Sequence, residues 1–377
     1  MATILAAALA APSALAHPVR VGRYAEIPFG IAPEHPYPAD RGGPRRTGRM
    51  RGRVPIGAPA RVWAVSPGHR SPRGPTIAGD GTLFFGTTGG LVALGPDGRE
   101  RWSLRVGPVG DAPSLAPSGA LVASTRTGRL VVVSPDGVLL RQIEVRATVR
   151  GAPLVLDDGS ILLTSRDRRL RRFDADLRLE RSVLLPEEPI AAPSRTAAGP
   201  LAVGAGSQLV LATLRGEIAR RISLGSPLTA EVVVADDGTL WALTRSGAVL
   251  ALDGRGNVRF RVDLGTRLNG GASAALGPDG ALRVPTLAEG VVCIGPGGTE
   301  RWRHAGASGF TSALSVDEDS TVLGVDHENH LVALEASGAE RWRVGLGGFS
   351  VEAPIVTEDG LIVVALESGQ IQAWRAP

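Results

Sequence analysis

The sequence predicts an all-β protein, an eight-bladed β-propeller built from four-stranded antiparallel blades. Three observations lead to this prediction: a phrase that recurs about every 40 residues, a turn that keeps the same period, and a spare N-terminal strand that completes the last blade. Repeats of this length are typical of propellers and solenoids. A helical solenoid is disfavoured because no helical pattern of about 10 residues accompanies the repeat.

The recurring phrase is clearest in "LVALGPDGRERW" at 91–102 and "LVALEASGAERW" at 331–342. Weaker copies stand between and after these two, and consecutive copies are 39, 40, 39, 40, 42, 40 and 40 residues apart. Their first residues are Leu91, Leu130, Leu170, Leu209, Val249, Val291, Leu331 and Ile371. Eight copies predict eight blades.

A turn lies 11 or 12 positions before each phrase, for example at Asp80-Gly81, Asp158-Gly159 and Asp359-Gly360. Asp-Gly between two apolar runs is a strong hairpin signal, because glycine accepts the positive φ that tight turns need. A second turn precedes each phrase, so each period divides into four short strands. Several of these strands are apolar at successive positions, as in "LIVVAL" at 361–366, which indicates a strand that is covered on both faces.

The ring is expected to close through the N-terminus. The eighth phrase is followed by too few residues for a fourth strand, whereas "ARVWAV" at 60–65 precedes the first blade. This stretch carries Trp63, and the repeat places an aromatic residue 11 positions after the phrase start, at Trp102, Phe260, Trp302 and Trp342. We therefore expect 60–65 to pair with the last blade and to remove the exposed edge between first and last blades.

Composition excludes several classes of function. All 41 cationic residues are arginine, and 37 acidic residues are interleaved with them, so the net charge of +4 does not predict a nucleic-acid-binding protein. One cysteine, Cys293, allows neither an intrachain disulfide nor a cysteine-based metal cluster. After the N-terminal 16 residues, no apolar stretch reaches the ~18 residues of a transmembrane helix.

The N-terminal region lies outside the predicted propeller, which we place at 59–377. Residues 1–16 are apolar and end in Ala14-Leu15-Ala16, which predicts a signal peptide and a protein exported to the periplasm or secreted, although the basic n-region is missing. The alternative is an alanine-rich tail. Residues 17–58 are rich in proline and arginine and predict an extended, disordered linker, or alternatively a peptide that folds onto a partner.

The repeat resembles that of the PQQ-like β-propellers, the quinoprotein alcohol dehydrogenase-like superfamily. "APLVLDDG", "APIVTEDG" and "GGLVALGPDGRERW" carry the resemblance, which covers about 60–377. It implies that the repeated aromatic residue packs between adjacent blades, here Trp63, Trp102, Phe260, Trp302 and Trp342. Blades two to four depart from the pattern, because Arg141, Arg181 and Arg220 take the tryptophan position.

The dehydrogenases that the sequence resembles use an adjacent cysteine pair, a catalytic Asp and Glu and Asn ligands for calcium beside the quinone. With one cysteine and three asparagines, this chain is expected to be no enzyme and to hold no cofactor. The chain is similar in length and blade count to the non-enzymatic BamB-like lipoproteins. We therefore expect an exported, monomeric scaffold that docks a protein partner in the cell envelope, or alternatively a propeller that binds a small molecule or carbohydrate.

A candidate docking surface comes from the turns before two phrases, which carry Arg126, Arg129, Arg166, Arg168 and Arg169. Equivalent turns of neighbouring blades lie on one face, so these residues predict a basic patch for an acidic partner or an anionic membrane. The alternative is an ordinary solvated edge.

A second candidate is "DHENH" at 326–330. Its His327, Glu328 and His330 have types and spacing that suit a transition metal. A solvated polar turn is the favoured interpretation.

Overall fold

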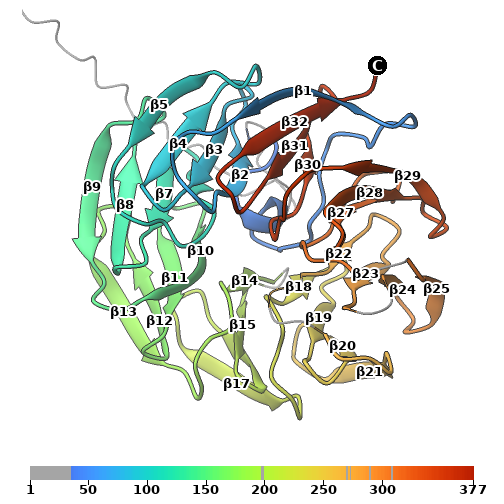
Figure 1. Cartoon of the computed structure of the whole chain (residues 1–377). Helices are drawn as coiled ribbons and strands as arrows, with labels where there is room; N and C mark the ends of the chain where they lie inside the picture. Colours follow the sequence, from blue (N-terminus) through green and yellow to red (C-terminus); the bar gives the residue numbers. More distant parts are fainter. Residues whose placement is uncertain (1–34, 197–198, 269–270, 272, 288–289, 307–308) are drawn as a thin grey trace, which may run out of the picture.

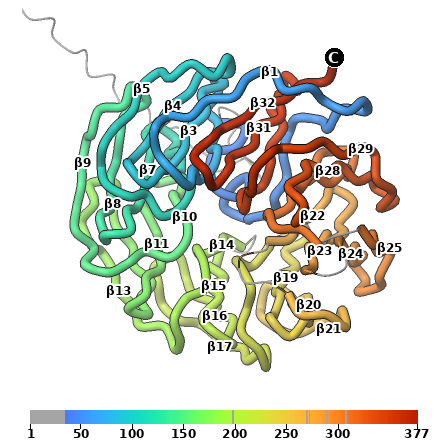
Figure 2. Tube along the Cα trace, viewed as in Figure 1, coloured from blue at the N-terminus to red at the C-terminus, as the bar shows by residue number. Residues whose placement is uncertain are grey.

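The computed structural model describes residues 35–196, 199–268, 271, 273–287, 290–306 and 309–377. Eight four-stranded sheets stand around a central axis, and the chain visits them in sequence order (Figures 1 and 2). All neighbouring strands in a sheet are antiparallel, as the hairpin turns of the sequence predict. The predicted eight-bladed propeller is confirmed.

In blades one to seven the first strand lies nearest the axis and the fourth lies outside, whereas in blade eight β30 lies nearest the axis and β1 lies outside (Figure 1). The strands of blades one to four are β2 (Arg73–Ile77), β3 (Leu83–Gly86), β4 (Leu91–Leu94), β5 (Glu100–Leu104); β6 (Ser114–Leu115), β7 (Leu121–Ser124), β8 (Arg129–Val133), β9 (Leu139–Glu144); β10 (Val149–Val155), β11 (Ile161–Ser165), β12 (Arg169–Phe173), β13 (Leu179–Leu184); and β14 (Ser194–Arg195), β15 (Leu201–Ala205), β16 (Gln208–Ala212), β17 (Ile218–Ser223). Those of blades five to eight are β18 (Val233–Val234), β19 (Leu240–Leu243), β20 (Ala248–Leu252), β21 (Val258–Asp263); β22 (Ala275–Leu276), β23 (Leu282–Pro285), β24 (Val291–Ile294), β25 (Glu300–His304); β26 (Ser315–Val316), β27 (Val322–Val325), β28 (His330–Leu334), β29 (Glu340–Gly345); and β30 (Ile355–Val356), β31 (Ile362–Ala365), β32 (Ile371–Arg375) with β1 (Ala60–Val65).

The core lies between the blades. The second strand of every blade is buried along its whole length, as β7 and β31 illustrate. One apolar cluster, for example, joins Leu209 and Leu211 of blade four to Leu240 and Leu250 of blade five. Each blade is covered by a neighbouring blade on both sides, so its inner strands are buried on both faces. This is why their sequences are apolar at successive positions.

The ring closes as the sequence predicts. β1 pairs with β32, and the sheet order of blade eight is β1-β32-β31-β30. Trp63 stands opposite Ala373, in the register in which Trp102 stands opposite Ala93 in blade one. The N-terminal strand therefore takes the outer position of the last blade.

Residues 35–58, which we call the N-terminal segment, correct the prediction of a disordered linker over 17–58. Carbonyl groups of this segment accept hydrogen bonds, at 2.7–3.0 Å, from the innermost strands of six blades. The acceptors Tyr37, Pro38, Pro44, Arg45, Thr47 and Gly48 bind the N–H groups of Ile77, Leu115, Arg195, Val234, Leu276 and Val316, respectively. Side chains of Arg46 and Met50 reach the innermost strands of blades three and eight. The segment thus crosses the central channel and contacts every blade.

The arginines of the N-terminal segment explain why it is held in the ring. Five of the six form ion pairs with acids of blades five, seven and eight. The pairs are Arg41 with Glu231, Arg45 and Arg49 with Asp236, Arg51 with Glu358, and Arg53 with Asp319. A segment that looks like a solvated linker in isolation is therefore complementary in charge to the ring around it.

Residues 1–34 lie outside the described residues, and with them the predicted signal peptide at 1–16 and the first part of the predicted linker. In the part of the chain that the structure covers, no helix has the length and apolar character needed to cross a membrane.

Candidate functional site

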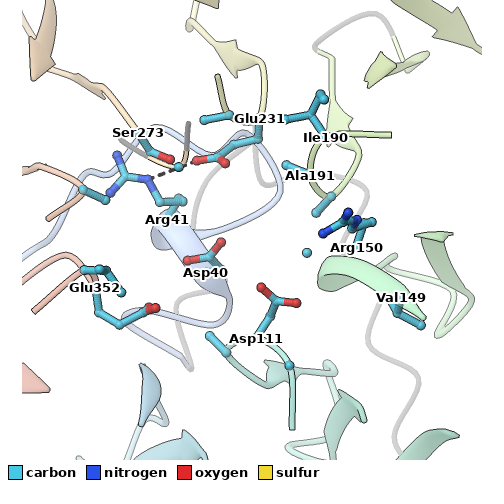
Figure 3. Close-up of a pocket in the computed structure, with 18 of the residues that line it drawn as sticks. Asp40, Arg41, Asp111, Val149, Arg150, Ile190, Ala191, Glu231, Ser273 and Glu352 are labelled. Carbon is cyan, nitrogen blue, oxygen red and sulfur yellow. Dashed lines mark ion pairs between the residues drawn. The ribbon is translucent and has the colours of Figure 1, made fainter. Parts of the chain in front are cut away.

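A cavity of about 750 Å³ lies on the axis of the ring, and we call it the cup. Its wall consists mainly of the loops that lead into the innermost strands, and its floor includes the 3-10 turn η1 (Asp40–Gly42) of the N-terminal segment. Side chains from several blades point into the same space (Figure 3). Charged groups dominate this lining, whereas small-molecule pockets are usually lined mostly by apolar groups.

The floor is fixed by Arg41, whose guanidinium is 3% exposed. Its Nη1 donates to the carbonyl of Leu314 at 2.6 Å and its Nη2 to the carbonyl of Ala274 at 2.5 Å. Its Nε lies 3.3 Å from Oε1 of Glu231 (Figure 3). One side chain of the N-terminal segment is thereby bonded to blades five, six and seven, and the floor of the cup cannot move independently of the ring.

Three further carboxyl groups surround the floor, those of Asp40, Asp111 and Glu352 (Figure 3). Burial, together with the negative charge of Glu231, raises the pKa of Asp40 to about 6. Burial also raises the pKa of Asp111, and it raises that of Glu352 to about 7 although Arg73 Nη1 lies 2.9 Å from Glu352 Oε1. The cup is therefore able to take up or release protons near neutral pH.

The rim of the cup is lined by positively charged arginines, whereas the floor is surrounded by carboxyl groups. Arg126, Arg166 and Arg245 project from the turns between the second and third strands of blades two, three and five, and Arg150 comes from β10. Arg150 and Arg166 share Oε1 of Glu188, at 2.5 and 3.2 Å. Arg126 and Arg245 are exposed and form no ion pair within the described residues. Their charges are available to a partner or a ligand.

The five arginines of the predicted basic patch do not lie together. Arg126 and Arg166 lie together at the rim of the cup. The other three do not line it: Arg129 pairs with Glu144 at 3.0 Å, Arg168 donates to the carbonyl of Pro186, and Arg169 donates to Ser182. The role of the patch in docking stays a prediction.

Sequence reasoning missed the other charged groups of the cup, which are Asp40, Arg41, Asp111, Arg150, Glu231, Arg245 and Glu352. Arg245 had a usable signal, because it occupies the same turn position as Arg126 and Arg166. The acids lie in loops of irregular sequence, where no repeat position marks them.

The repeated aromatic residues lie at the seams between blades. Trp63, Trp102 and Trp302 each donate from the indole N–H to a carbonyl in the last hairpin turn of the next blade, at Pro96, Pro135 and Ala336. Trp342 has no such turn in blade eight and donates instead to Pro55 of the N-terminal segment, at 2.8 Å. Phe260 packs edge-on against Trp241 of its own blade, with ring centroids 5.6 Å apart, and its other neighbour is Gly298 in the last hairpin turn of blade six, where a Cβ would lie 2.6 Å from the ring. We propose that these residues dock adjacent blades.

The three arginines in the tryptophan position make polar contacts across their seams. Arg141 lies 3.2 Å from Asp176, Arg181 2.5 Å from Glu217, and Arg220 donates to the carbonyl of Arg255 at 2.6 Å. Each partner belongs to the following blade. At the seams that follow blades two, three and four, an exposed ion pair or hydrogen bond therefore takes the place of the contact of an indole.

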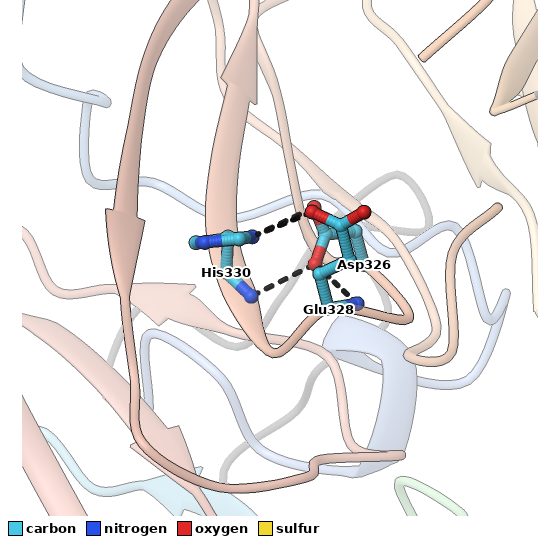
Figure 4. Close-up of side chains that lie close together, drawn as sticks. All are labelled: Asp326, Glu328 and His330. Carbon is cyan, nitrogen blue, oxygen red and sulfur yellow. Dashed lines mark hydrogen bonds and ion pairs between the residues drawn. The ribbon is translucent and has the colours of Figure 1, made fainter. Parts of the chain in front are cut away.

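The "DHENH" turn brings together Asp326, Glu328 and His330, with potential ligand atoms within 4.8 Å of one another (Figure 4). Asp326 Oδ1 accepts the backbone N–H groups of Glu328 and His330, and its Oδ2 lies 2.6 Å from Nη1 of Arg343. A guanidinium therefore occupies the position beside the carboxylate that a cation would need. The contacts favour a polar turn stabilised by its own hydrogen bonds; His327 is not part of the triad.

A comparison of the sequence with known families identifies a match at residues 93–222 and 287–376, which together exceed half of the chain. The matching family is described as outer membrane protein assembly factor BamB, with PQQ-type repeats. The chain belongs to this family. No curated protein sequence matches the chain significantly.

Solved structures similar to this member of the family include two dehydrogenases and a BamB protein. Quinohemoprotein alcohol dehydrogenase from Comamonas testosteroni has a TM-score of 0.77 at 12% identity, covering 92% of this chain and 82% of its own. BamB from Moraxella catarrhalis has a TM-score of 0.67 at 14% identity, covering 85% and 98%. A europium-containing methanol dehydrogenase has a TM-score of 0.72 at 13% identity, covering 90% of each chain. At these identities the likeness shows the fold alone.

The cup does not fit the quinone and calcium that the dehydrogenase branch implies. Among its described lining residues there is no cysteine, no asparagine and no aromatic side chain. Cys293 is buried in β24, the third strand of blade six. Two of the four acids, Glu231 and Glu352, are paired with arginines. The donor set of this family member thus lacks the groups expected against a quinone ring and most of those expected around calcium.

Proposed function

We propose that this chain is a non-enzymatic, exported propeller that docks a protein partner in the cell envelope through the rim of the cup. The observation that carries the proposal is the pair Arg126 and Arg245, two exposed arginines of blades two and five that line a polar cavity and form no ion pair in the described part of the chain. Membership of the BamB family supports the choice of a docking role over catalysis.

The positive charge of the rim favours a partner that presents an acidic segment. Arginine binds carboxylates bidentately, and such pairs set specificity and association rate at interfaces. An acidic segment of a partner would meet Arg126, Arg166 and Arg245 before it reaches the carboxyl groups of the floor. The floor repels further acidic side chains, so the segment stays at the rim.

The test is affinity capture of the tagged full-length chain after crosslinking in its native cells, with envelope and cytosol fractionated. The double variant Arg126→Glu/Arg245→Glu should lose the envelope partner that the wild type captures. Arg215→Glu/Arg255→Glu is the matched control, because both arginines are exposed on the last hairpin turns of blades four and five, at the opposite end of the blades. Equal capture by the two double variants contradicts the proposal.

A small molecule in the cup is the second candidate, and it is favoured by the convergence of Asp40, Asp111 and Glu352 in a cavity of about 750 Å³. Such a ligand would carry a cationic group toward these acids. Thermal denaturation in the presence of candidate amines and sugars tests it, with PQQ and calcium included. We expect no stabilisation by PQQ and calcium, because the lining lacks the quinone-binding groups.

A further inference from the structure

The fourth strands of blades four and five, β17 and β21, lie on the outside of the ring and carry an excess of positive charge (Figure 1). Together these two strands contain four arginines and one acid, Asp263. The arginines are Arg220, Arg221, Arg259 and Arg261, and all four are exposed. Arg259 lies 3.3 Å from Asp237, whereas the other three form no ion pair within the described residues.

Blades six and seven show how an arginine of the fourth strand is neutralised elsewhere in the ring. A glutamate three residues earlier holds the arginine: Glu300 lies 2.9 Å from Arg303, and Glu340 lies 3.0 Å from Arg343. The side chains of these two arginines are only 28 and 25% exposed. By the register of the third and fourth strands, the equivalent residues of blades four and five are Arg221 and Arg261.

Blades four and five lack this glutamate. The strand register places Ile218 and Val258 where Glu300 and Glu340 stand in blades six and seven. Val258 is apolar and yet 51% exposed. The arginine that follows it, Arg261, makes only a long hydrogen bond of 3.5 Å to a backbone carbonyl. The guanidinium groups of blades four and five are therefore free of the carboxylate that holds their counterparts.

Two further arginines extend the positive surface. Arg220 crosses the seam to the carbonyl of Arg255 in blade five, and Arg261 reaches back to a carbonyl at the end of blade four, so both guanidinium groups lie at the same seam. Arg267 follows the end of β21, is exposed, and forms no ion pair in the part of the chain that the structure describes. We call Arg220, Arg221, Arg261 and Arg267 the outer basic wall.

The outer basic wall suits an extended anionic surface. Its cations are spread over two neighbouring outer strands and the loop that follows them (Figure 1). Interfaces between proteins place apolar anchors in pockets at their centre. On β17 and β21, both of which are described in full, Val258 is the one large apolar side chain that is exposed. An anionic bilayer needs no such anchor, because each arginine near its surface adds to the attraction and binds phosphate oxygens bidentately.

We propose that the outer basic wall binds the phosphate groups of an anionic lipid bilayer, so that blades four and five face the membrane surface. This proposal goes beyond the docking function above, because the wall is separate from the rim of the cup. The cations of the wall are exposed, and salt screens exposed charges. Binding is therefore expected to weaken as the ionic strength rises.

The first test is co-sedimentation of the full-length protein with vesicles of phosphatidylglycerol and phosphatidylcholine, compared with vesicles of phosphatidylcholine alone. We expect binding to the anionic vesicles at low ionic strength, release by salt at roughly 0.5 M, and no binding to the neutral vesicles. Equal binding to both kinds of vesicle, or binding to neither, overturns the proposal.

The second test uses the ion pair of blades six and seven. Val258→Glu places the glutamate beside Arg261 and should weaken binding to the anionic vesicles about fivefold. Leu179→Glu is the matched control: Leu179 has the same strand position in blade three and is 54% exposed, but Ser182 follows it three residues later. The control adds the same charge away from the wall and should bind as the wild type does. Equal weakening by the two variants contradicts the proposal.

A pair of double variants tests the arginines directly. Arg221→Ala/Arg261→Ala should weaken vesicle binding about tenfold or more, because two unpaired cations are lost. Arg303→Ala/Arg343→Ala removes two cations that glutamates already hold, so its binding should stay within about twofold of the wild type. Equal losses would assign the binding to net charge rather than to the wall and would overturn the proposal.

Two comparisons separate the wall from the rim and from a protein partner. If Arg126→Glu/Arg245→Glu loses vesicle binding while Val258→Glu keeps it, the rim meets the membrane and the proposal is wrong. If poly-L-glutamate binds the wild type but not Val258→Glu, and anionic vesicles bind neither, the wall is a protein-docking surface and the proposal is also wrong. Loss of vesicle binding in Val258→Glu with unchanged capture of the envelope partner supports the wall and leaves the docking function standing by itself.

Discussion

Arg41 illustrates how a single side chain holds the N-terminal segment in the ring. Its backbone is left-handed, with φ 59°, a conformation that costs a residue with a Cβ about 1–2 kcal/mol. The guanidinium offsets this strain through two carbonyls and Glu231, which is itself 8% exposed. A buried ion pair is a weak source of net stability, but breaking one by removing a single partner leaves an uncompensated charge.

Arg41→Ala should therefore lower the free energy of unfolding by about 3–5 kcal/mol, because the buried Glu231 loses its counter-ion and two carbonyls lose their donor. Chemical denaturation at neutral pH measures the change. Arg53→Ala is the control: its pair with Asp319 is 3.7 Å long and both side chains are more than half exposed, so its effect should stay below about 1 kcal/mol. Equal effects would mean that Arg41 does not anchor the segment.

The carboxyl groups of the cup predict a dependence of stability on pH. The pKa of Asp40 rises from 3.8 to about 6 and that of Glu352 from 4.5 to about 7, so the folded protein holds these protons more tightly than the unfolded chain. Their contribution is complete below the unfolded values and is lost as the pH rises through the folded values. Arg41, Arg46, Glu231 and Asp111 face Asp40, and Arg73 faces Glu352.

Asp40→Asn/Glu352→Gln should flatten this dependence, because neither amide titrates. The measurement is the free energy of unfolding at about pH 5 and about pH 8, in wild type and variant. The wild type should lose more stability than the variant over this range. An identical loss in both proteins would assign the dependence to other groups.

At the scale of the element, the seam between two blades is a unit made of one outer strand and one hairpin turn. In the tryptophan seams the indole lies against a glycine of the turn and donates to a carbonyl two residues earlier, as Trp302 does with Gly338 and Ala336. Glycine is needed there for two reasons: Gly338 has φ 87°, and a Cβ would lie 2.6 Å from the ring. In the last hairpin turn of blade three, Leu177 takes the position of this glycine, also with a positive φ; its side chain fits because the preceding blade supplies no indole.

Substitutions at two glycines can distinguish the cost of the positive φ from the cost of the close contact with the indole. Gly360 has φ 82° and no neighbouring atom within 4 Å of a Cβ, so Gly360→Ala should cost only the left-handed conformation, about 1–2 kcal/mol. Gly338→Ala adds the displacement of Trp302 and should cost clearly more, about 3 kcal/mol or above. Thermal unfolding of the two variants measures the difference, and equal midpoints would show that the indole does not depend on close contact with the turn.

At the scale of the whole molecule, the sequence predicts what repeats and misses what does not. The positions of the blades and the closing strand β1 follow from a period near 40 residues, because each blade must present the same apolar strand to its neighbours. The N-terminal segment has no period, and its partners are spread over all eight blades, as the 273 residues between Arg41 and Leu314 illustrate. Read locally, its proline and arginine content is that of a linker.

The cup was missed for a related reason. Its acids come from loops such as those of Asp111 and Glu352, whose convergence depends on ring geometry and on η1 beneath them. The turn arginines were found because they do repeat. A usable signal for the N-terminal segment was charge: six arginines between 41 and 53 without an acid among them, against a ring whose hairpin turns are rich in aspartate.

The contacts of the N-terminal segment predict that it would stay bound if its covalent connection to β1 were cut. Ile56 is 86% exposed and Gly57 has no neighbouring atom within 4 Å of a Cβ, so a protease site inserted there in the full-length chain should be cleaved without unfolding. The two pieces should then co-elute in gel filtration. Their thermal midpoint should rise with protein concentration, because unfolding now releases a separate fragment. The cut protein with Arg41→Ala should lose the fragment at lower denaturant, because the bonds of the Arg41 side chain to blades five, six and seven are missing. Separation of the wild-type fragment from a ring of unchanged stability would instead mean that the channel contacts do not support the blades.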